Sequence, residues 1–327
     1  MIKNKLSKKQ LDFLEGVGHG GCQSLYRRAM ELGITVEPLK TDSHIIKFSF
    51  GGKKIYVRRG YLPTHRMLGI FTRYKSTTKS VLADGGLRVP KGIIIGNKQR
   101  VNIKDTKLRT PLIIKPDDSS RAIGLSWNIM TQAELDRAIV FARKADNRII
   151  VEEKFEGDEY RVLVYRGRVV SAVHKIPATI IGDGICTVKE LIENFDKTRA
   201  DGFKINVDKI VRQTLREHGL TMKSVLPRGR SLKLRNNVNM SDGGRCINKT
   251  RQFTKAYKDI CIKAVSLLNI EMGGVDIIIK NIQNPKSYVI LEVNPNPYIN
   301  MHEASLVEGP AVDVSELILK NLFPSLR

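Results

Sequence analysis

The sequence predicts an α+β fold that contains several antiparallel hairpins. Segments with helical spacing of apolar residues are mixed with short runs of β-branched and aliphatic residues, which are typical of strands. Turn residues, such as the pair Gly51 and Gly52, separate neighbouring strand segments by hairpin-length gaps. The chain has no regular strand–helix–strand repeat, so the pattern favours α+β over a regular βαβ architecture.

Residues 1–87 predict an N-terminal α/β domain. Helical spacing extends from residue 1 to about residue 40, with Gly33 as a helix stop. Two strands and a helix complete this part, at residues 45–50, 54–57 and 75–83.

Residues 88–155 predict a central lobe. Thr131 and Glu134 have the spacing of a capping box, which predicts a helix that begins there and runs to about Ala145. Four strands are expected around this helix, at residues 93–95, 111–115, 124–129 and 148–153.

Residues 156–327 predict a C-terminal lobe with substrate loops at about 175–248. Residues 182–248 look loop-rich and basic, and a segment of that length is too long to be idle in a compact domain. The regular elements expected in this lobe are strands at 159–165, 169–174, 274–279 and 289–294, and helices at 254–268 and 314–322.

The chain is strongly basic. Its 56 lysines and arginines against 33 acidic residues give a formal net charge of +23. This excess indicates either a solubility device or an acidic ligand, such as nucleotide phosphates, an acidic peptide or nucleic acid. The basic residues are spread along the chain, and no aromatic-plus-basic cluster resembles an RNA-binding strand. Charge therefore favours anionic small molecules or peptides and disfavours nucleic acid.

Membrane and secretion signals are missing from the sequence. No apolar run approaches the ~20 residues that span a bilayer, and no apolar segment follows the basic N-terminus as a secretory signal requires. Cys22, Cys186, Cys246 and Cys261 lack the spacing of a metal site or a disulfide framework. We therefore expect a cytoplasmic protein without a membrane partner.

Two strand-like segments near the C-terminus each carry an acid within an apolar run. Asp276 lies in the first segment, and Glu292 and Asn294 lie in the second, with a turn between the two at residues 284–287. A hairpin would bring these three side chains together. Carboxylate and amide oxygens are the donors that Mg²⁺ accepts, and buried acids need a cation or another partner to stay ionised. The hairpin therefore predicts a magnesium site.

Lys115 ends an apolar strand and is followed by a polar loop. One interpretation is a lysine that extends from a core strand to water. The other is a clamp on a nucleotide phosphate, closed by the hydroxyls of Ser119 and Ser120 and by the backbone N–H groups of the loop.

Acidic residues surround the chain reversal at residues 152–159. A solvated charged turn is one interpretation. The alternative is a hinge whose backbone meets an adenine edge while Glu159 accepts hydrogen bonds from ribose hydroxyls.

The basic loops downstream supply further cations. Lys175 and Arg235 are either surface charges or groups that neutralise phosphate and carboxylate oxygens in a substrate channel. His174 and His302 are candidate bases, although a single histidine is more often a structural hydrogen-bonding group.

Taken together, these segments resemble the ATP-grasp carboxylate–amine ligases, and in particular the ATP-grasp parts of cyanophycin synthetase and of bifunctional glutathione synthetases. The resemblance extends from about Lys75 to Pro324. The matching segments are residues 115–116, 151–161, 175–191, 234–244, 274–276, 292–294, 301–302 and 322–324.

The resemblance implies a three-part fold that holds ATP between two α+β lobes, together with Mg²⁺, for which we expect two ions and Mn²⁺ as an alternative. Lys75 and Lys115 would hold phosphates, and Asp276, Glu292 and Asn294 would hold the metal. Glu152, Glu153 and the backbone near Phe155 would face adenine, and Glu159 would face the ribose. The catalytic residues implied are Arg235, Arg161 and Lys175, next to the transferring phosphoryl group.

The expected function is ATP-dependent amide-bond formation through an acyl phosphate, with an amino-acid or acidic-peptide substrate. One alternative is a macrocyclase or modifier of an acidic precursor peptide or protein. Another is a non-catalytic protein that binds nucleotide or nucleic acid. A homodimer is also an open alternative.

Overall fold

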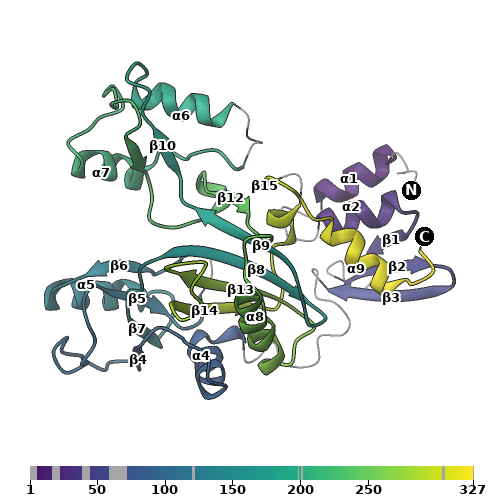
Figure 1. Ribbon diagram of the computed structural model, residues 1–327, viewed down its shortest axis with the longest axis horizontal. Helices are drawn as coiled ribbons and strands as arrows, with labels where there is room; N and C mark the ends of the chain where they lie inside the picture. The colour runs from purple at the N-terminus through teal and green to yellow at the C-terminus, as the bar shows by residue number, and fades with distance from the viewer. Residues whose placement is uncertain are drawn as a thin grey trace. The chain divides into compact units, whose positions relative to one another are not determined.

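The computed structural model describes residues 6–16, 23–38, 45–58, 72–119, 122–197, 199, 202–303 and 306–326, and its mixed helices and antiparallel sheets confirm the α+β prediction (Figure 1). The chain divides into two compact units. Unit 1 comprises residues 1–173 and 248–327, and unit 2 comprises residues 174–247. The expected division into residues 1–87, 88–155 and 156–327 stays a prediction.

The largest sheet has six strands in the order β14-β13-β8-β9-β12-β15. Helices α4 (Lys75–Asp84) and α8 (Lys255–Leu267) pack against its β14 and β13 strands (Figure 1). Apolar side chains of β8, β13 and α8, such as Val162, Ile277 and Cys261, form the core between them. The strands are β8 (Asp158–Tyr165), β9 (Arg168–Ile176), β12 (Arg245–Asn248), β13 (Met272–Ile279), β14 (Tyr288–Asn294) and β15 (Val307–Glu308).

A four-stranded antiparallel sheet in the order β4-β7-β5-β6 lies within residues 88–155. Helix α5 (Gln132–Ala142) covers one face, and its Leu135 and Ile139 pack on Ile114 and Val151. The Thr131 side chain accepts a hydrogen bond from Glu134 N and completes the predicted capping box. The strands are β4 (Gly92–Ile95), β5 (Leu112–Pro116), β6 (Ser126–Ile129) and β7 (Ile149–Glu153).

The N-terminal segment and the C-terminal helix form a common core. Strand order is β1-β2-β3, and α2 packs on α9, so a helix from each end of the described chain lies beside the other (Figure 1). Strand β1 was not predicted, since the helical spacing was extended to residue 40. The elements are α1 (Lys8–Gly16), α2 (Gln23–Glu31), β1 (Thr35–Pro38), β2 (Ile45–Phe50), β3 (Lys53–Arg58), the 3₁₀ turn η2 (Ile299–His302) and α9 (Val314–Leu322).

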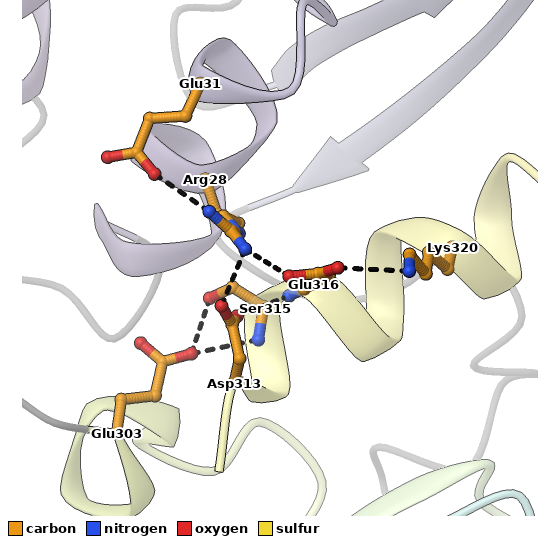
Figure 2. A network of polar contacts seen from close by, with 7 residues as sticks. All are labelled: Arg28, Glu31, Glu303, Asp313, Ser315, Glu316 and Lys320. Atoms are coloured by element: carbon orange, nitrogen blue, oxygen red, sulfur yellow. Dashed lines mark hydrogen bonds and ion pairs between the residues drawn. The ribbon is translucent and has the colours of Figure 1, made fainter. Parts of the chain in front are cut away.

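A polar network joins α2 to α9 (Figure 2). Arg28 Nη2 lies 2.9 Å from Asp313 Oδ2 and also pairs with Glu316, while its Nη1 lies 3.2 Å from Glu31 Oε2. Lys320 and Glu316 lie 3.1 Å apart on the next turn of α9. This network attaches the first helices to the last helix through charge-assisted hydrogen bonds.

Residues 182–248, expected to be loop-rich and basic, also contain regular elements that were not predicted. Two helices and a small two-stranded sheet enclose a core of their own, which includes Val188, Val211 and Leu226. Thr187 and Glu190 form a capping box that begins α6, a signal that the sequence reading did not use. The elements are β10 (Thr179–Ile181), α6 (Val188–Asp196), α7 (Lys209–Glu217), β11 (Ser231–Lys233) and the 3₁₀ turn η1 (Met240–Asp242).

Candidate functional site

A row of three charged residues crosses the large sheet. Arg161 on β8 lies directly opposite Asp276 on β13, and Asp276 lies directly opposite Glu292 on β14. Residues opposite each other in neighbouring strands share a face of the sheet. Arg161 binds both oxygens of Asp276, with Nη2 2.6 Å from Oδ2, and the same Nη2 lies 3.9 Å from Glu292 Oε1. The predicted hairpin therefore brings both acids together, as expected from the sequence.

Asn294 and Gly274 complete this part of the site. Asn294 donates a hydrogen bond from Nδ2 to Glu292 Oε1 at 3.0 Å. Gly274 lies opposite Asn294, where an added Cβ would approach Pro297 Cβ to 2.8 Å and Arg161 Cδ to 3.0 Å. The absence of a side chain at Gly274 thus leaves room for the Arg161 guanidinium beside the acids. We call Arg161, Asp276, Glu292 and Asn294 the acid row.

The acid row has the donor chemistry of a magnesium site. Burial and the neighbouring Asp276 carboxylate both raise the pKa of Glu292. Burial acts to lower the pKa of Arg161, and the Asp276 carboxylate acts to raise it. The net shift is upward, so the guanidinium stays charged. Two adjacent carboxylates with one arginine leave an excess of negative charge, which a hard cation would offset.

Asn294 is essential to this interpretation. Within the part of the chain that the structure describes, no group of three or more His, Cys, Asp and Glu side chains forms a metal cluster. The expected metal site therefore relies on the two carboxylates and the amide oxygen of Asn294, and it stays a prediction.

A second cluster lies on the four-stranded sheet. Glu152 on β7 is 2 % exposed, and its two oxygens each meet a lysine: Oε1 pairs with Lys115 and Oε2 with Lys79. Burial lowers the pKa of Lys79 to about 8. Burial acts to raise the pKa of Glu152, and the two ammonium groups act to lower it. The net shift is downward, so Glu152 stays ionised.

Lys75 joins these lysines from the first turn of α4. Its ammonium donates to the Ser119 carbonyl oxygen and lies 3.5 Å from Asp117 O. Burial lowers the pKa of Lys75, and so does the charge of Lys115 nearby. We call Lys75, Lys79, Lys115 and Glu152 the lysine cluster. Its three ammonium groups meet one carboxylate, so its excess charge is positive.

The buried residue Asp117 orients α4 toward this cluster. Tyr74 at the N-cap of α4 makes no side-chain capping bond. Asp117 supplies the cap instead, because its Oδ1 accepts from Ser76 N at 2.8 Å and its Oδ2 accepts from Ser76 Oγ at 2.6 Å. Arg148 Nη2 lies 3.1 Å from the same Oδ2. Asp117, which follows the strand of Lys115, thereby caps the start of the helix that carries Lys75 and Lys79.

The two clusters are neighbours within unit 1. Burial acts to lower the pKa of both Lys75 and Lys115, and the negative charge of Glu292 in the acid row acts in the opposite direction on each. Helix α4 also packs against β14, the strand of Glu292. The structure therefore brings together Lys75, Lys115, Glu152, Asp276 and Glu292, which the sequence predicted as parts of one site.

The expected hinge lies between β7 and β8. Glu153 Oε1 accepts from Arg109 N at 3.1 Å, and the Phe155 ring lies 5.1 Å from Lys280 Nζ. Glu159 lies on β8 near enough to Arg161 for its charge to raise the arginine pKa. Gly157 allows this turn, because an added Cβ would lie 2.6 Å from Ile279 O. The predicted adenine and ribose contacts stay predictions.

Arg235 and Lys175 belong to unit 2. Arg235 is 4 % exposed, and its Nη2 lies 2.9 Å from Asp208 Oδ2 and 2.8 Å from Asn206 O. Asp208 also caps α7, so Arg235 stabilises the start of that helix. Lys175 and His174 are partly buried at the end of β9. The catalytic roles implied for Arg235 and Lys175 stay predictions, and Ser120 lies outside the described residues.

His302 is buried beneath the site. Its Nδ1 lies 2.9 Å from Ser171 Oγ, and its Nε2 has no hydrogen-bond partner. Burial and the positive charge of Arg161 lower the pKa of His302 to about 3. A neutral imidazole with so low a pKa is a weak base, which favours the structural interpretation over the general-base interpretation.

Lys79 and Asp117 were missed by sequence reasoning. Lys79 lies four residues after Lys75 and therefore on the same face of α4, a helical spacing that would have indicated it. Asp117 follows Lys115 in the strand-to-loop transition, and nothing in the sequence indicates that it caps a distant helix.

Comparison with known proteins tests the expected family. Residues 83–223 match the sequence model of the D-ala D-ala ligase C-terminus. The glutathione biosynthesis bifunctional protein of Clostridium perfringens is 31 % identical over 296 residues, which cover 86 % of this chain and 38 % of that protein. The cyanophycin synthetase of Nostoc sp. is 33 % identical over 262 residues, which cover 77 % of this chain and 29 % of that protein.

The fold agrees as well. The crystal structure of a bifunctional glutathione synthetase from Pasteurella multocida superposes with a TM-score of 0.69 at 25 % identity, over 93 % of this chain and 44 % of that chain. The chain thus spans less than half the length of the relatives it matches. The expected resemblance is confirmed, and this chain belongs to the ATP-grasp family.

Proposed function

We propose that the chain is an ATP-dependent ligase that joins a carboxylate to an amine. The observation that carries this proposal is the pairing of two neighbouring clusters with opposite excess charge. The lysine cluster suits the phosphates of a nucleotide, and the acid row suits the metal ion that accompanies them. The relatives of this chain are ligases that form amide bonds with ATP.

Each cluster has a defined role in the proposal. Lys75 and Lys115 hold phosphate oxygens, and Arg161 keeps the acid row in register through its two bonds to Asp276. Mg²⁺, held by Asp276, Glu292 and Asn294, would neutralise charge on the phosphate oxygens. The hinge at Glu153 and Phe155 faces adenine, and Glu159 faces the ribose. Two metal ions, or Mn²⁺ in place of Mg²⁺, are part of the same proposal.

The reaction needs no nucleophilic side chain. A substrate carboxylate oxygen attacks the γ-phosphorus of ATP, and ADP leaves as the bond to the bridging oxygen breaks. The amine nitrogen then attacks the acyl carbon, inorganic phosphate leaves, and the ammonium proton goes to solvent. The protein contributes position and charge, which are the main sources of catalysis in phosphoryl transfer. Arg235 and Lys175 are the proposed cations for the acyl phosphate.

The proposed substrates are an amino acid and an acidic peptide. The relatives are named for the synthesis of glutathione and cyanophycin. The formal net charge of +23 also suits an acidic substrate. A homodimer and a cytoplasmic location are proposals from the sequence, and the latter relies on cysteines, of which Cys186, Cys246 and Cys261 are free thiols. No helix among the described residues is long and apolar enough to cross a bilayer.

Release of ADP and phosphate tests this function. The chain would be incubated with ATP, Mg²⁺ and pairs of amino acids or acidic peptides, and product masses would be measured. We expect release that depends on both a carboxylate and an amine, with a product heavier than either substrate. A product that has lost one water within a single molecule would instead indicate cyclisation. No release across the panel, together with salt-sensitive binding of RNA or DNA, would contradict the ligase proposal.

A further inference from the structure

The lysine cluster contains two residues that carry charge although they are almost completely buried. Glu152 is 2 % exposed, and Lys79 is 8 % exposed. A buried carboxylate is tolerated when cations offset its charge, and here Lys79 and Lys115 each take one of its oxygens. The cluster is therefore organised around Glu152.

The strand register explains why Glu152 reaches Lys115. Ile113 on β5 lies opposite Glu152, and Lys115 lies opposite Ile150. Lys115 and Glu152 therefore share one face of the sheet as diagonal neighbours, while Ile114 and Val151 face the core under α5. Long side chains on such diagonal positions can touch, and this fixes the direction of the Lys115 ammonium.

Gly92 makes room for the pair from the other side. It lies opposite Glu152 on β4, and an added Cβ would lie 2.9 Å from Glu152 Cβ and 2.7 Å from Val151 O. Lys79 lies on α4. The start of this helix is capped by Asp117, which directly follows the strand that carries Lys115. Three elements thus converge on one carboxylate.

Lys79 changes the charge of the cluster. A Lys115–Glu152 pair by itself is neutral, and a neutral pair attracts an anion weakly. A second ammonium on the same carboxylate restores positive charge while it holds Glu152 in place.

We propose that Glu152 and Lys79 are positioning residues that hold the Lys115 ammonium at the phosphates of a bound nucleotide. The proposal rests on the proposed use of ATP. It adds a second role to the adenine contact expected for Glu152 from the sequence, since each carboxylate oxygen binds a lysine.

Nucleotide binding separates the two roles. Dissociation constants for ADP and inosine diphosphate would be measured by calorimetry for the full chain and its variants. The two nucleotides share their phosphates but differ at the 6-position of the base. We expect Glu152→Gln to weaken both by about tenfold, because one charge-assisted hydrogen bond to Lys115 is lost. A loss of ADP affinity with unchanged inosine diphosphate affinity would overturn the proposal and favour an adenine contact.

A double-mutant cycle tests the route through Lys115. We expect Lys115→Met to weaken ADP by roughly ten- to a hundredfold, and Glu152→Gln to add less than about twofold in that background. An equal effect of Glu152→Gln with and without Lys115 would overturn the proposal. Lys79→Met should weaken both diphosphates by about threefold, and Lys79→Arg should restore binding.

Control measurements separate an effect on nucleotide binding from a loss of folded structure. Lys255→Met removes a lysine of an exposed pair with Asp259 on α8, and it should leave ADP affinity unchanged. Thermal unfolding of each variant checks the fold, and if Glu152→Gln does not fold, the Lys79 variants in the Lys115→Met background carry the test. If the wild-type chain binds neither diphosphate, the proposed function fails, which is distinct from a failure of the positioning proposal.

Discussion

The acid row and the network between α2 and α9 both pair one arginine with acids, but they differ in burial. In the network, the side chains of Glu31, Asp313 and Glu316 are 20 %, 45 % and 20 % exposed, so water solvates part of their charge. In the acid row, the Asp276 side chain that binds Arg161 is 5 % exposed, and the Glu292 side chain beside it is 33 % exposed. Charge excess in solvent costs little, whereas buried excess needs a partner. The comparison shows why the same residue types are structural in one place and suit a ligand in the other.

The lysine cluster extends this comparison to the opposite sign. Its three lysines exceed its single carboxylate, whereas the two carboxylates of the acid row exceed its arginine. Neighbouring clusters with opposite excess charge partly stabilise each other, because the Glu292 carboxylate favours the charged forms of Lys75 and Lys115. Such an arrangement suits a ligand that is itself a pair of charges, namely a phosphate chain with a metal ion.

The largest expected effect is the loss of activity when an acid of the row is removed. Glu292→Ala and Asp276→Ala should lower amine-dependent ADP release by at least about a thousandfold, since a metal ion stabilises transition-state charge by several kcal/mol. Release would be measured at saturating ATP and Mg²⁺, and circular dichroism would check the fold. Full activity in both variants would contradict the metal assignment. Asp313→Ala, in the network between α2 and α9, is the matched control and should keep activity.

The next effect distinguishes the two arginines. Arg161→Gln leaves the buried Asp276 carboxylate beside Glu292 without its arginine, so the free energy of unfolding should fall by about 3 kcal/mol. Added Mg²⁺ should restore more of this loss than it adds to the wild-type chain, because the ion supplies the missing positive charge. Arg28→Gln should also destabilise the chain, but Mg²⁺ should not restore it. Urea unfolding with and without MgCl₂ gives both values, and equal Mg²⁺ effects in the two variants would remove the distinction.

ADP binding measured with and without Mg²⁺ distinguishes the role of the lysine cluster from that of the acid row. Without Mg²⁺, Lys115→Met should weaken ADP binding by roughly ten- to a hundredfold. Glu292→Gln should leave Mg²⁺-free ADP binding within about threefold and abolish its strengthening by Mg²⁺. Calorimetric titrations with and without the ion measure both. If the two variants behave alike, the clusters do not divide phosphate and metal between them.

The smallest effect concerns His302, which Arg161 and burial keep neutral. Its folded pKa is about 3, while an unfolded histidine has a pKa of about 6.5. Below the unfolded-state pKa, the unfolded chain binds a proton at this histidine that the folded chain does not bind. The free energy of unfolding therefore decreases as the pH decreases. From pH 7 to pH 5 this group should cost about 2 kcal/mol.

Urea unfolding at the two pH values checks this contribution. His302→Asn should reduce the loss of stability between pH 7 and pH 5, and His218→Asn on the surface should not. Equal pH dependence in wild type and His302→Asn would show that the histidine titrates normally.

Local signals predicted many elements of this fold. The bounds of α9, residues Val314–Leu322, were predicted in full, and Thr131 and Thr254 each begin a helix as expected. The hairpin that aligns Asp276 with Glu292 was also predicted, because apolar strands and a turn between them determine which residues face each other. The helices α6 and α7 of unit 2 were not predicted, because each is short and lies between loops, although Thr187 and Asp208 are both capping residues.

The sequence by itself determined that the chain has an α+β fold and that acids and lysines lie at the ends of apolar strands, because periodicity and turn chemistry act over a few residues. Only the tertiary structure decided that Arg161 binds Asp276, that Lys79 and Lys115 share Glu152, and that Asp117 caps α4. These contacts join separate strands and a helix, so they depend on sheet register and helix packing. Charges that look alike along the chain become distinct once burial and neighbours are known.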